Sequence, residues 1–265
     1  MTKTLRRLPV DENVVKLQKL LSSNGYFADR LPPHGIFEDI THENVVLFQQ
    51  QHIDKDGVPL EADGVVGNKT WWALKHPSGN AQRNHFQAII PSGLTSTRQQ
   101  LLELIFEEHA KPVFEVPDGS NRSPHIDYYW GTTGVIGLPW CCAFVSWALF
   151  EILGSYPING RHHLGVQDMW REARQNGLGT PEPKPGDIFI QVKESGKGHT
   201  GFVVSVSADG KHIYTGEGNC GNRLKIGRRT TTSIHHYIDC LGDEQTTEFE
   251  RKNFDVAVVD AQGTR

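Results

Sequence analysis

The residue types best suited to chemistry in this sequence are a cysteine, a histidine and an acid–amide pair. Cys141 follows Trp140 directly before an apolar stretch. We expect it at a helix N-terminus, where the helix dipole lowers the pKa of a thiol and unpaired backbone N–H groups can hold an oxyanion. His199 opens a predicted strand, and Glu217 and Asn219 follow the next one. A thiolate, an imidazole base and a group that orients the imidazole are the parts of a cysteine hydrolase site.

Each of these residues also has an ordinary structural interpretation. Cys141 and Cys142 are small apolar residues of a type that is commonly buried in a core. Glu217 and Asn219 are typical of turns. Because a helix advances by about 100° per residue, we expect the adjacent thiols to face different surroundings, Cys141 the imidazole of His199 and Cys142 the core. The combination of residues, and no single one of them, favours the catalytic interpretation.

The elements that would position these residues form an α+β pattern in the C-terminal part of the chain. Helices are predicted at 98–109, 141–153 and 166–175. The second is apolar nearly all round and is therefore expected to be buried. Strands are predicted at 187–192, 201–207 and 211–215, and within 224–231 and 234–240. Helices followed by strands indicate an α+β domain with an antiparallel sheet.

The first 76 residues show the pattern of a small three-helix bundle. An amphipathic helix is predicted at 12–23, a second helix begins with Thr41 as its N-cap, and a third is short, at 70–74. We find no internal repeat. A stretch rich in Pro, Gly, Ser and Asn follows and is predicted to be a linker. The predicted domains are a helical module (1–76), the linker (77–95), the α+β domain (96–241) and a C-terminal tail (242–265).

Composition and charge exclude several classes of protein. The 265 residues are 37% apolar and 22% charged, with a net charge of −4, which is globular and unlike a basic nucleic-acid-binding protein. The longest apolar stretch, 141–153, is shorter than the ~20 residues that a membrane-spanning helix needs. The basic N-terminus lacks the apolar region of a secretory signal peptide. Four cysteines, two of them adjacent, favour reduced or reactive thiols over a disulfide framework.

Metal chemistry is not indicated by the histidines or by the acidic turns. The thirteen histidines include the adjacent pairs at 162–163 and 235–236 but no H-E-x-x-H pattern, and neighbours converge on one metal less easily than an i, i+4 pair. A stretch beginning at Asp54 is similar to a calcium loop, but its twelfth position is Val65, where a Glu is required. We therefore expect no metal and no other cofactor.

Four motifs together resemble the CHAP family of cysteine, histidine-dependent amidohydrolases/peptidases. They are Pro-Trp-Cys-Cys-Ala-Phe-Val-Ser-Trp (139–147), Lys-Pro-Gly-Asp-Ile (184–188), Gly-His-Thr-Gly-Phe-Val-Val (198–204) and Gly-Glu-Gly-Asn (216–219). The resemblance covers 96–241 and implies a papain-like α+β fold. It also implies Cys141 as the nucleophile, His199 as the base, and Glu217 and Asn219 as its orienting groups. Cys142 departs from the family pattern, which usually has a small residue such as Ala there.

Three further residues, Trp140, Tyr129 and Thr200, are expected to contact the substrate. The N-terminal module resembles the three-helix type of peptidoglycan-binding domain, through stretches such as Val15-Lys-Leu-Gln18, Gly35-Ile-Phe37, Phe48-Gln49 and Asp63-Gly64-Val65-Val66-Gly67. It departs from that family at His34-Gly35, where Asp-Gly is usual, and in 55–62, which lengthens the last loop.

Together the two resemblances imply an endolysin-like, monomeric peptidoglycan hydrolase that cleaves an amide of the stem peptide or its link to muramic acid. Peptidoglycan is then its partner, with no nucleic acid and no membrane insertion. We expect it to be made in the cytoplasm and to reach the wall through a phage holin-type hole or an injection machine. Two alternatives stay open, a cysteine peptidase or transamidase acting on proteins and a non-catalytic wall-binding protein. Cleavage of casein-like substrates would indicate the first, and wall binding without release of fragments the second.

Overall fold

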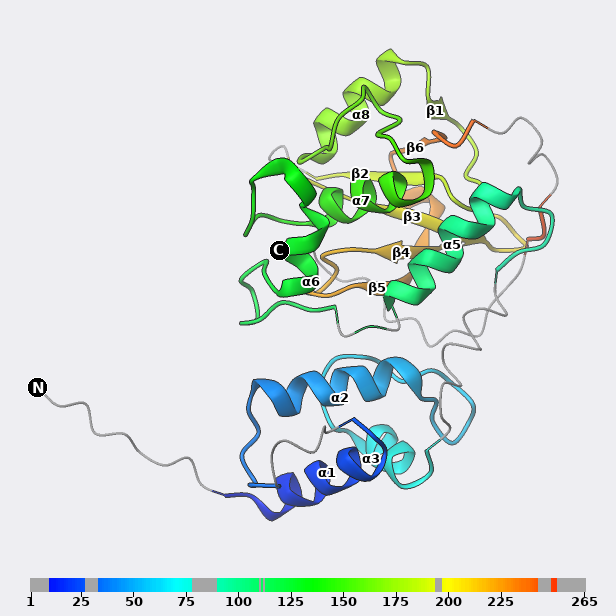
Figure 1. The fold of residues 1–265 in the computed structure, drawn as a ribbon. Coiled ribbons are helices and arrows are strands. Elements are labelled where there is room, and N and C mark those ends of the chain that lie inside the picture. Colours follow the sequence, from blue (N-terminus) through cyan, green and yellow to red (C-terminus); the bar gives the residue numbers. More distant parts are fainter. Residues whose placement is uncertain are drawn as a thin grey trace, which may run out of the picture. The chain divides into compact units, whose positions relative to one another are not determined.

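Residues 10–26, 33–77, 90–109, 111, 113–193, 197–242 and 249–251 are described by a computed structural model (Figure 1). The chain forms two compact units, Met1–Gln82 and Arg83–Arg265. The predicted domain boundaries stay predictions, and most of the predicted linker and C-terminal tail lies outside the described residues. Within the described ranges, no helix combines the length and the apolar character that crossing a membrane requires.

The N-terminal unit packs three helices, α1 (Glu12–Ser23), α2 (Asp39–Gln51) and α3 (Asn68–Lys75), around one small core. The core is apolar and consists of Leu17, Leu21, Val45, Phe48, Leu60, Ala73 and Leu74. Helix α1 begins after Asp11, whose carboxylate accepts a hydrogen bond from the N–H of Asn13 at 2.7 Å, a typical N-cap. Helix α2 begins at Asp39, two residues before the predicted start. The predicted N-cap, Thr41, is instead buried inside the helix, where it accepts a hydrogen bond from Gln18.

The N-terminal unit contains one hydrogen-bonding arrangement twice, although no internal repeat is found in the sequence. Each copy consists of a buried helical glutamine, a turn glycine and the threonine of the following helix: Gln18, Gly35 and Thr41, then Gln49, Gly64 and Thr70. In both, the glutamine Oε1 accepts from the glycine N–H (3.0 and 2.8 Å), and Nε2 donates to the threonine Oγ1 (3.0 and 3.1 Å). Both glycines have positive φ, +76° and +72°, which other residues rarely adopt. Three shared positions in about 25 residues are too few to show a repeat in the sequence.

The C-terminal unit is an α+β domain, as predicted, and its described residues form one antiparallel sheet. Its helices are α5 (Ser96–His109), α6 (Pro124–Tyr129), α7 (Cys141–Leu153) and α8 (Val166–Gln175). Its strands are β1 (Gly179–Thr180), β2 (Ile188–Val192), β3 (Gly198–Val206), β4 (His212–Glu217), β5 (Lys225–Thr230) and β6 (His236–Ile238). Their order in the sheet is β1-β6-β2-β3-β4-β5. Helix α6 and strand β1 were not predicted, since six and two residues are too short for a periodic signal.

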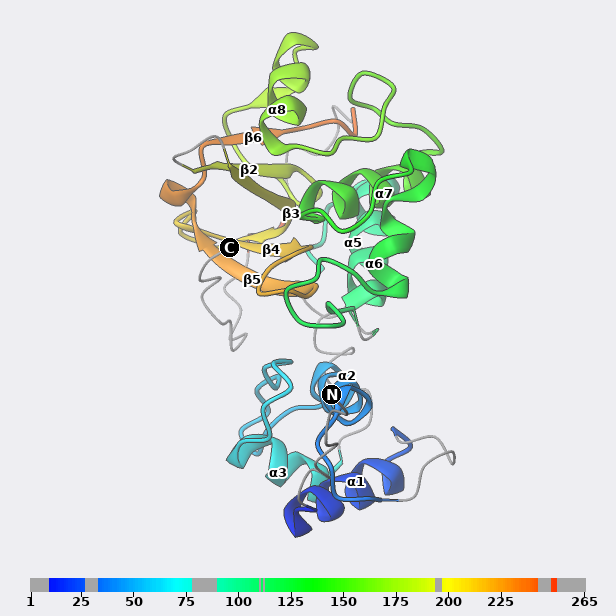
Figure 2. The ribbon, with the colours of Figure 1, turned by 90° about the vertical axis from the view of Figure 1, so that its left-hand side faces the viewer.

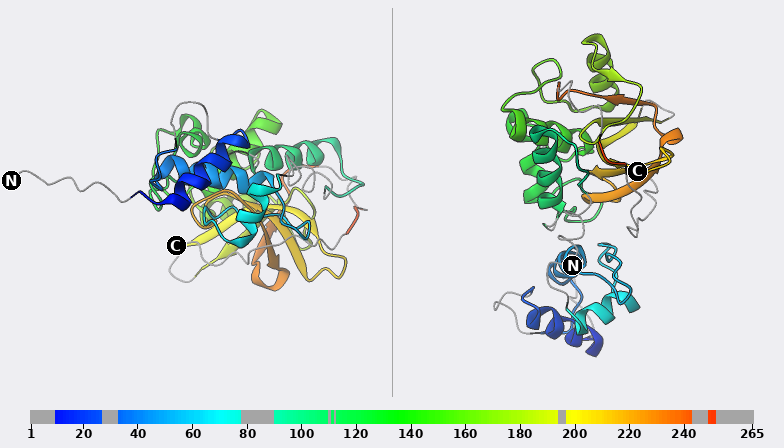
Figure 3. Two further views of the ribbon diagram at one scale, coloured as in Figure 1. Left: turned by 90° about the horizontal axis from the view of Figure 1, so that it is seen from below. Right: turned by 90° about the vertical axis from the view of Figure 1, so that its right-hand side faces the viewer.

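The two faces of this sheet have different roles. Figure 2 shows α5, α6 and α7 stacked against one face, and the right-hand view of Figure 3 shows the same two layers from the other side. On the helix-covered face, alternate strand residues such as Ile188, Ile190 and Phe202 join the main core. On the opposite face, Phe189 and Val203 belong to a second, smaller apolar cluster. This alternation follows from the period of two in a strand, and it decides which polar strand residues can meet.

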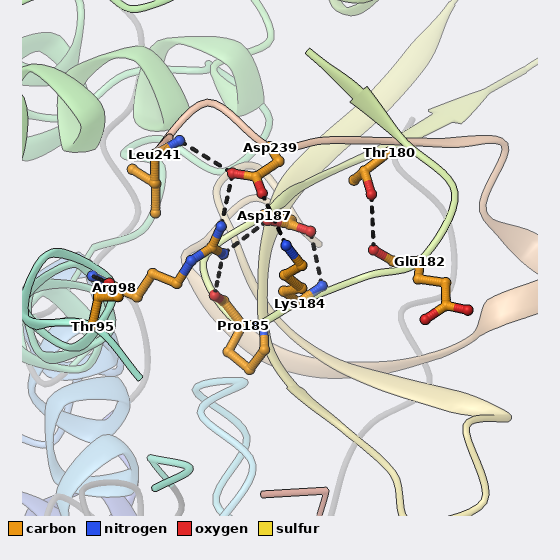
Figure 4. Close-up of polar contacts among 9 residues, drawn as sticks. All are labelled: Thr95, Arg98, Thr180, Glu182, Lys184, Pro185, Asp187, Asp239 and Leu241. Carbon is orange, nitrogen blue, oxygen red and sulfur yellow. Dashed lines mark hydrogen bonds and ion pairs between the residues drawn. The ribbon is translucent and has the colours of Figure 1, made fainter. Parts of the chain in front are cut away.

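A buried ion-pair network explains the motif at 184–188 (Figure 4). Arg98 of α5 is fully buried. Its Nη1 donates to the carbonyl of Pro185 at 2.6 Å and to Asp187 Oδ1 at 2.8 Å, and its Nη2 donates to Asp239 Oδ1 at 2.7 Å. A Cβ on Gly186 would lie only 3.3 Å from the Arg98 side chain, so glycine leaves room for the guanidinium. The motif therefore attaches α5 to the loop before β2.

Candidate active site

Cys141 is the first residue of α7, as predicted, and Trp140 is the N-cap residue. The Cys141 side chain is buried, with 5% of the residue exposed. The pKa of its thiol is held well below the ordinary value, first by a hydrogen bond with the Cys142 thiol and then by His199 and the Cys142 backbone N–H. Burial opposes these effects. The local environment therefore favours a thiolate at Cys141, which is the nucleophilic form.

Cys142 lies beside Cys141 in the same cavity, which the sequence did not predict. Its thiol hydrogen-bonds with that of Cys141, and this contact, followed by burial, raises the pKa of Cys142 well above the ordinary value. Both cysteines line one cavity. The prediction that Cys142 belongs to the core is confirmed, since it lies in the main apolar cluster with 1% exposed. The prediction that the two thiols cannot face the same cleft is wrong, since both cysteines line the cavity. The 100° rotation separates the Cα–Cβ directions, but rotation about each Cα–Cβ bond still brings the two sulfur atoms together.

His199 is the second residue of β3 and is fully buried. Its Nε2 is 2.7 Å from Glu217 Oε2, which leaves Nδ1 as the ring nitrogen that can exchange a proton with Cys141. Burial alone would lower the pKa of His199. The hydrogen bond with Glu217 and the proximity of Cys141 outweigh burial and raise this pKa above its ordinary value. The imidazole is therefore poised to carry a proton next to a thiolate.

Glu217 is the last residue of β4, and its carboxylate is surrounded by donors. Besides His199, it accepts hydrogen bonds from Arg229 Nε (2.7 Å) and Nη2 (2.6 Å) and from Thr215 Oγ1 (2.5 Å). Burial alone would raise the pKa of Glu217, but the hydrogen bonds from His199 and Arg229 hold it well below its usual range. The carboxylate is therefore ionised and fixed in place behind the imidazole.

Asn219 occupies a different place from the one that the resemblance implies. It lies two residues beyond β4 with a φ of +55°, and its Nδ2 donates to Asn121 Oδ1 at 3.1 Å. It lines the cavity that also contains Cys141. Among the hydrogen bonds of the described residues, the one that orients His199 comes from Glu217. Asn219 is thus placed to contact a substrate, while Glu217 holds the base.

The cavity at Cys141 has a volume of about 260 Å³ and a mostly apolar lining. Its walls come from the loop before α7, the start of α8 and the start of β3: Leu138, Pro139, Cys141, Cys142, Leu164, Gly165, Val166, Lys193, Lys197, Gly198 and Asn219. A Cβ on Gly198 would lie 2.8 Å from Val166, so glycine here allows α8 to approach β3. The two lysines are the ionisable groups of the lining other than the cysteines, and they make the cavity suited to an acidic substrate.

The structure does not place Trp140, Tyr129 or Thr200 where the sequence predicted, at a substrate-binding surface. Their exposures are 0%, 1% and 0%. Trp140 Nε1 donates to Glu115 at 3.1 Å, the hydroxyl of Tyr129 donates to Glu108 at 2.7 Å, and Thr200 Oγ1 donates to the Phe189 carbonyl at 2.8 Å. Their polar atoms are already used, and their bulk supports the walls of the site. As aromatic and hydroxyl groups they suggested binding, but the packing assigns them to the core.

Within the described part of the chain, one group of residues has the spacing of a metal site. It consists of His199, Glu217 and Cys220, whose ligand atoms lie within 4.8 Å of one another. The donor set does not fit a cation, because Arg229 donates to both oxygens of the same carboxylate. A metal ion would have to displace this guanidinium or stand beside its positive charge. The cluster is thus better described as a hydrogen-bonded charge network.

Several residues of the site were not predicted from the sequence, and they differ in how much local sequence signal they carry. Thr215 could have been found, because residues two apart on a strand share a face. Arg229 carries no such local signal. It stands on another strand, four residues beyond the direct cross-strand partner of Glu217, which is Lys225. Lys193 directly follows β2 and Lys197 directly precedes β3, and in the sequence both look like ordinary surface lysines.

Two family models match the chain. The model described as "CHAP domain" matches residues 133–219, and the model described as "Putative peptidoglycan binding domain" matches residues 10–74. No curated protein and no solved structure was found to match the chain. The first match includes the cavity cysteines and extends to Asn219 at the end of the range, and the second spans α1, α2 and nearly all of α3. The chain thus combines an N-terminal peptidoglycan-binding domain with a CHAP domain.

Proposed function

We propose that this chain, with a CHAP domain that follows a peptidoglycan-binding domain, is a cysteine-dependent peptidoglycan hydrolase. The observation that carries the proposal is the line of buried groups formed by Cys141, His199 and Glu217, with the sulfur at a helix N-terminus. A thiolate, a base and an oriented carboxylate in this order perform acyl transfer. The N-terminal domain would raise the local concentration of the wall at this site.

The reaction follows from these groups. The Cys141 thiol transfers its proton to His199, and the thiolate attacks the carbonyl carbon of the scissile amide. Backbone N–H groups at the start of α7 stabilise the oxyanion. His199 then gives its proton to the leaving nitrogen as the C–N bond breaks and a thioester forms. Water, deprotonated by His199, attacks the thioester and restores the Cys141 thiol.

The lining of the cavity supports an acidic peptide as the substrate. Lys193 and Lys197 line the same cavity as Cys141, and stem peptides of peptidoglycan carry carboxylates that such ammonium groups would pair with. The bond cleaved is then an amide of the stem peptide or the amide that joins it to muramic acid. Asn219, which lines the same cavity, would hydrogen-bond the substrate backbone.

In the N-terminal domain, a second cavity of about 630 Å³ supports wall binding. Its lining includes Phe37 and Val65, which are 42% and 64% exposed, together with the half-buried Trp71. Exposed apolar side chains next to an indole form the kind of surface on which sugars and peptides pack. We further propose that the protein is made in the cytoplasm and acts on the wall during phage lysis or after injection.

The decisive experiment incubates the full chain with purified sacculi and analyses the released fragments by mass spectrometry. Free peptides with intact glycan strands would identify amidase activity, and shortened peptides would identify endopeptidase activity. Cys141→Ala must abolish release. Cys240→Ala is the matched control, because Cys240 is a half-buried free cysteine that lies after β6 and does not line the cavity. Binding of the unaltered chain to sacculi without release of fragments would overturn the proposal.

A further inference from the structure

The carboxylate behind His199 is held by a buried arginine that none of the four sequence motifs contains. Arg229 lies on β5 and is 9% exposed. Its Nε and Nη2 donate to the two different oxygens of Glu217, at 2.7 and 2.6 Å. This two-point contact fixes the plane of the carboxylate as well as its position. The oxygen that faces Arg229 Nη2 is the one that bonds His199.

The sheet register explains how Arg229 reaches Glu217. On the shared face of β4 and β5, Glu217 pairs with Lys225, Thr215 with Gly227 and Ile213 with Arg229. The arginine must therefore pass over Gly227 to reach the carboxylate. A Cβ on Gly227 would lie 3.1 Å from Thr215 Oγ1 and 3.3 Å from Glu217 Oε1, so glycine leaves this path open.

The guanidinium is also held by strand β2, on the same face of the sheet. Its Nη1 donates to Gln191 Oε1 on β2 at 3.2 Å, and its central carbon lies 5.2 Å from the centre of the Phe189 ring, a cation–π distance. Strands β2, β4 and β5 thus all contribute to one arginine contact. Because Arg229 is buried and has partners on two other strands, we expect its ion pair with Glu217 to contribute more than a solvent-exposed ion pair does.

The charges of the buried groups balance only when Arg229 is counted. After proton transfer, the site holds a thiolate at Cys141, an imidazolium at His199, a carboxylate at Glu217 and a guanidinium at Arg229, with a sum of zero. Without the arginine, the same buried group would carry one net negative charge, which is costly in a poorly solvated site.

We propose that Arg229 is a positioning residue of the active site, which keeps Glu217 ionised and aligned behind His199 and neutralises the network when Cys141 has given its proton to the imidazole. The proposal rests on the proposed cysteine chemistry but not on the identity of the substrate. It makes the working unit four residues instead of three. Arg229 itself does not touch the reacting atoms.

The test measures how fast iodoacetamide alkylates Cys141 as a function of pH, with labelling located by peptide mass spectrometry. The thiolate is the reactive form, so the rise of the rate with pH reports its formation. Removing a nearby buried positive charge raises the pKa of every neighbouring group. Arg229→Gln keeps a hydrogen-bond donor but removes the charge. In this variant, the pH at which the alkylation rate rises should increase by about one unit.

Two further variants separate positioning from general damage. Arg229→Lys keeps the charge and should return the rise to within about 0.3 pH unit of the unaltered protein, a fraction of the shift expected from charge removal. Arg228→Gln is the matched control, because it removes the same charge from the neighbouring residue, which is exposed on β5. It should leave the pH dependence unchanged.

The outcomes divide clearly. A folded Arg229→Gln variant with an unshifted rise would overturn the proposal, and so would equal shifts in Arg229→Gln and Arg228→Gln. If Arg229→Gln does not fold, Arg229→Lys decides, since a shift of a full pH unit there despite the retained charge would contradict the charge argument. Because alkylation needs no cell wall, these results stand even if the chain fails to release fragments from sacculi.

Discussion

Replacing Glu217 by Gln separates the catalytic contribution of this carboxylate from its structural one. Glutamine keeps the size of the side chain but removes the charge, so Arg229 becomes a buried cation without a counter-charge. Removing one partner of a buried pair costs about 3–5 kcal/mol. For a unit of this size, 1 kcal/mol corresponds to about 2–4 °C in Tm. We therefore expect Glu217→Gln to lower the Tm by about 6–20 °C.

The same substitution removes the group that orients the base. His199 loses its 2.7 Å contact with a carboxylate and with it the stabilisation of the imidazolium. The loss of an orienting carboxylate in a related arrangement lowers kcat by up to roughly 10⁴-fold, and we expect a decrease between roughly 10-fold and 10⁴-fold here. Both effects are measured on one preparation, by thermal melts and by initial rates of sacculus digestion.

A double variant tells the two effects apart. Glu217→Gln combined with Arg229→Met removes both charges, so no buried ion is left unpaired, and most of the lost Tm should return. The activity should not return, because the imidazole still lacks its carboxylate. Recovery of activity together with stability would refute the orienting role of Glu217. Unchanged turnover in the folded single variant would move that role to Asn219 or to no residue.

The ionisation of Glu217 also predicts how stability depends on pH. Its pKa is lowered from 4.5, so its contribution is fully present above about pH 4.5 and is lost as the pH falls through the lower folded-state value. The difference in Tm between the unaltered protein and Glu217→Gln should therefore shrink as the pH is lowered from 6 to 3. A difference that stays constant over this range would contradict an ionised Glu217.

Three further predictions concern the thiols and the two binding surfaces. Cys141→Ala should abolish wall lysis without unfolding, and normal lysis by this variant would place the nucleophile elsewhere. Cys142→Ala should keep most activity and cost about 1 kcal/mol of stability. It should also slow alkylation of Cys141, because the hydrogen bond that lowers the pKa of Cys141 is lost. Lys197→Glu should raise the KM for sacculi by several-fold, as expected for a lost charge pair of roughly 1 kcal/mol, and an unchanged KM would remove this lysine from substrate binding. Replacing exposed Phe37 and Val65 by Ser should release the full chain from sacculi in a pull-down while its Tm changes by less than about 3 °C, and undiminished binding would place the wall contact outside this cavity.

Part of the fold, and the position of Cys141, follows from patterns among residues that are close together in the sequence. The thirteen-residue segment from Cys141, apolar except for Ser146 and Glu151, predicts a buried helix, and the residues before it place the thiol at its first position, where the structure has it. Alternation along the later segments predicts strands, and the order of elements predicts the α+β class. These features depend on neighbours within a few residues, because backbone hydrogen bonding and burial of one face repeat with a fixed period.

What the tertiary structure decided depends on neighbours that are distant in the sequence. Glu217 meets Arg229 only because β4 and β5 pair in one register and Gly227 lies between them, and a shift of one residue would turn the arginine to the other face. In the sequence, Tyr129 and Trp140 suggest a binding role. In the structure, their polar atoms donate hydrogen bonds to buried glutamates instead. Side-chain partners follow from register and packing, and these are properties of the whole sheet and its covering helices.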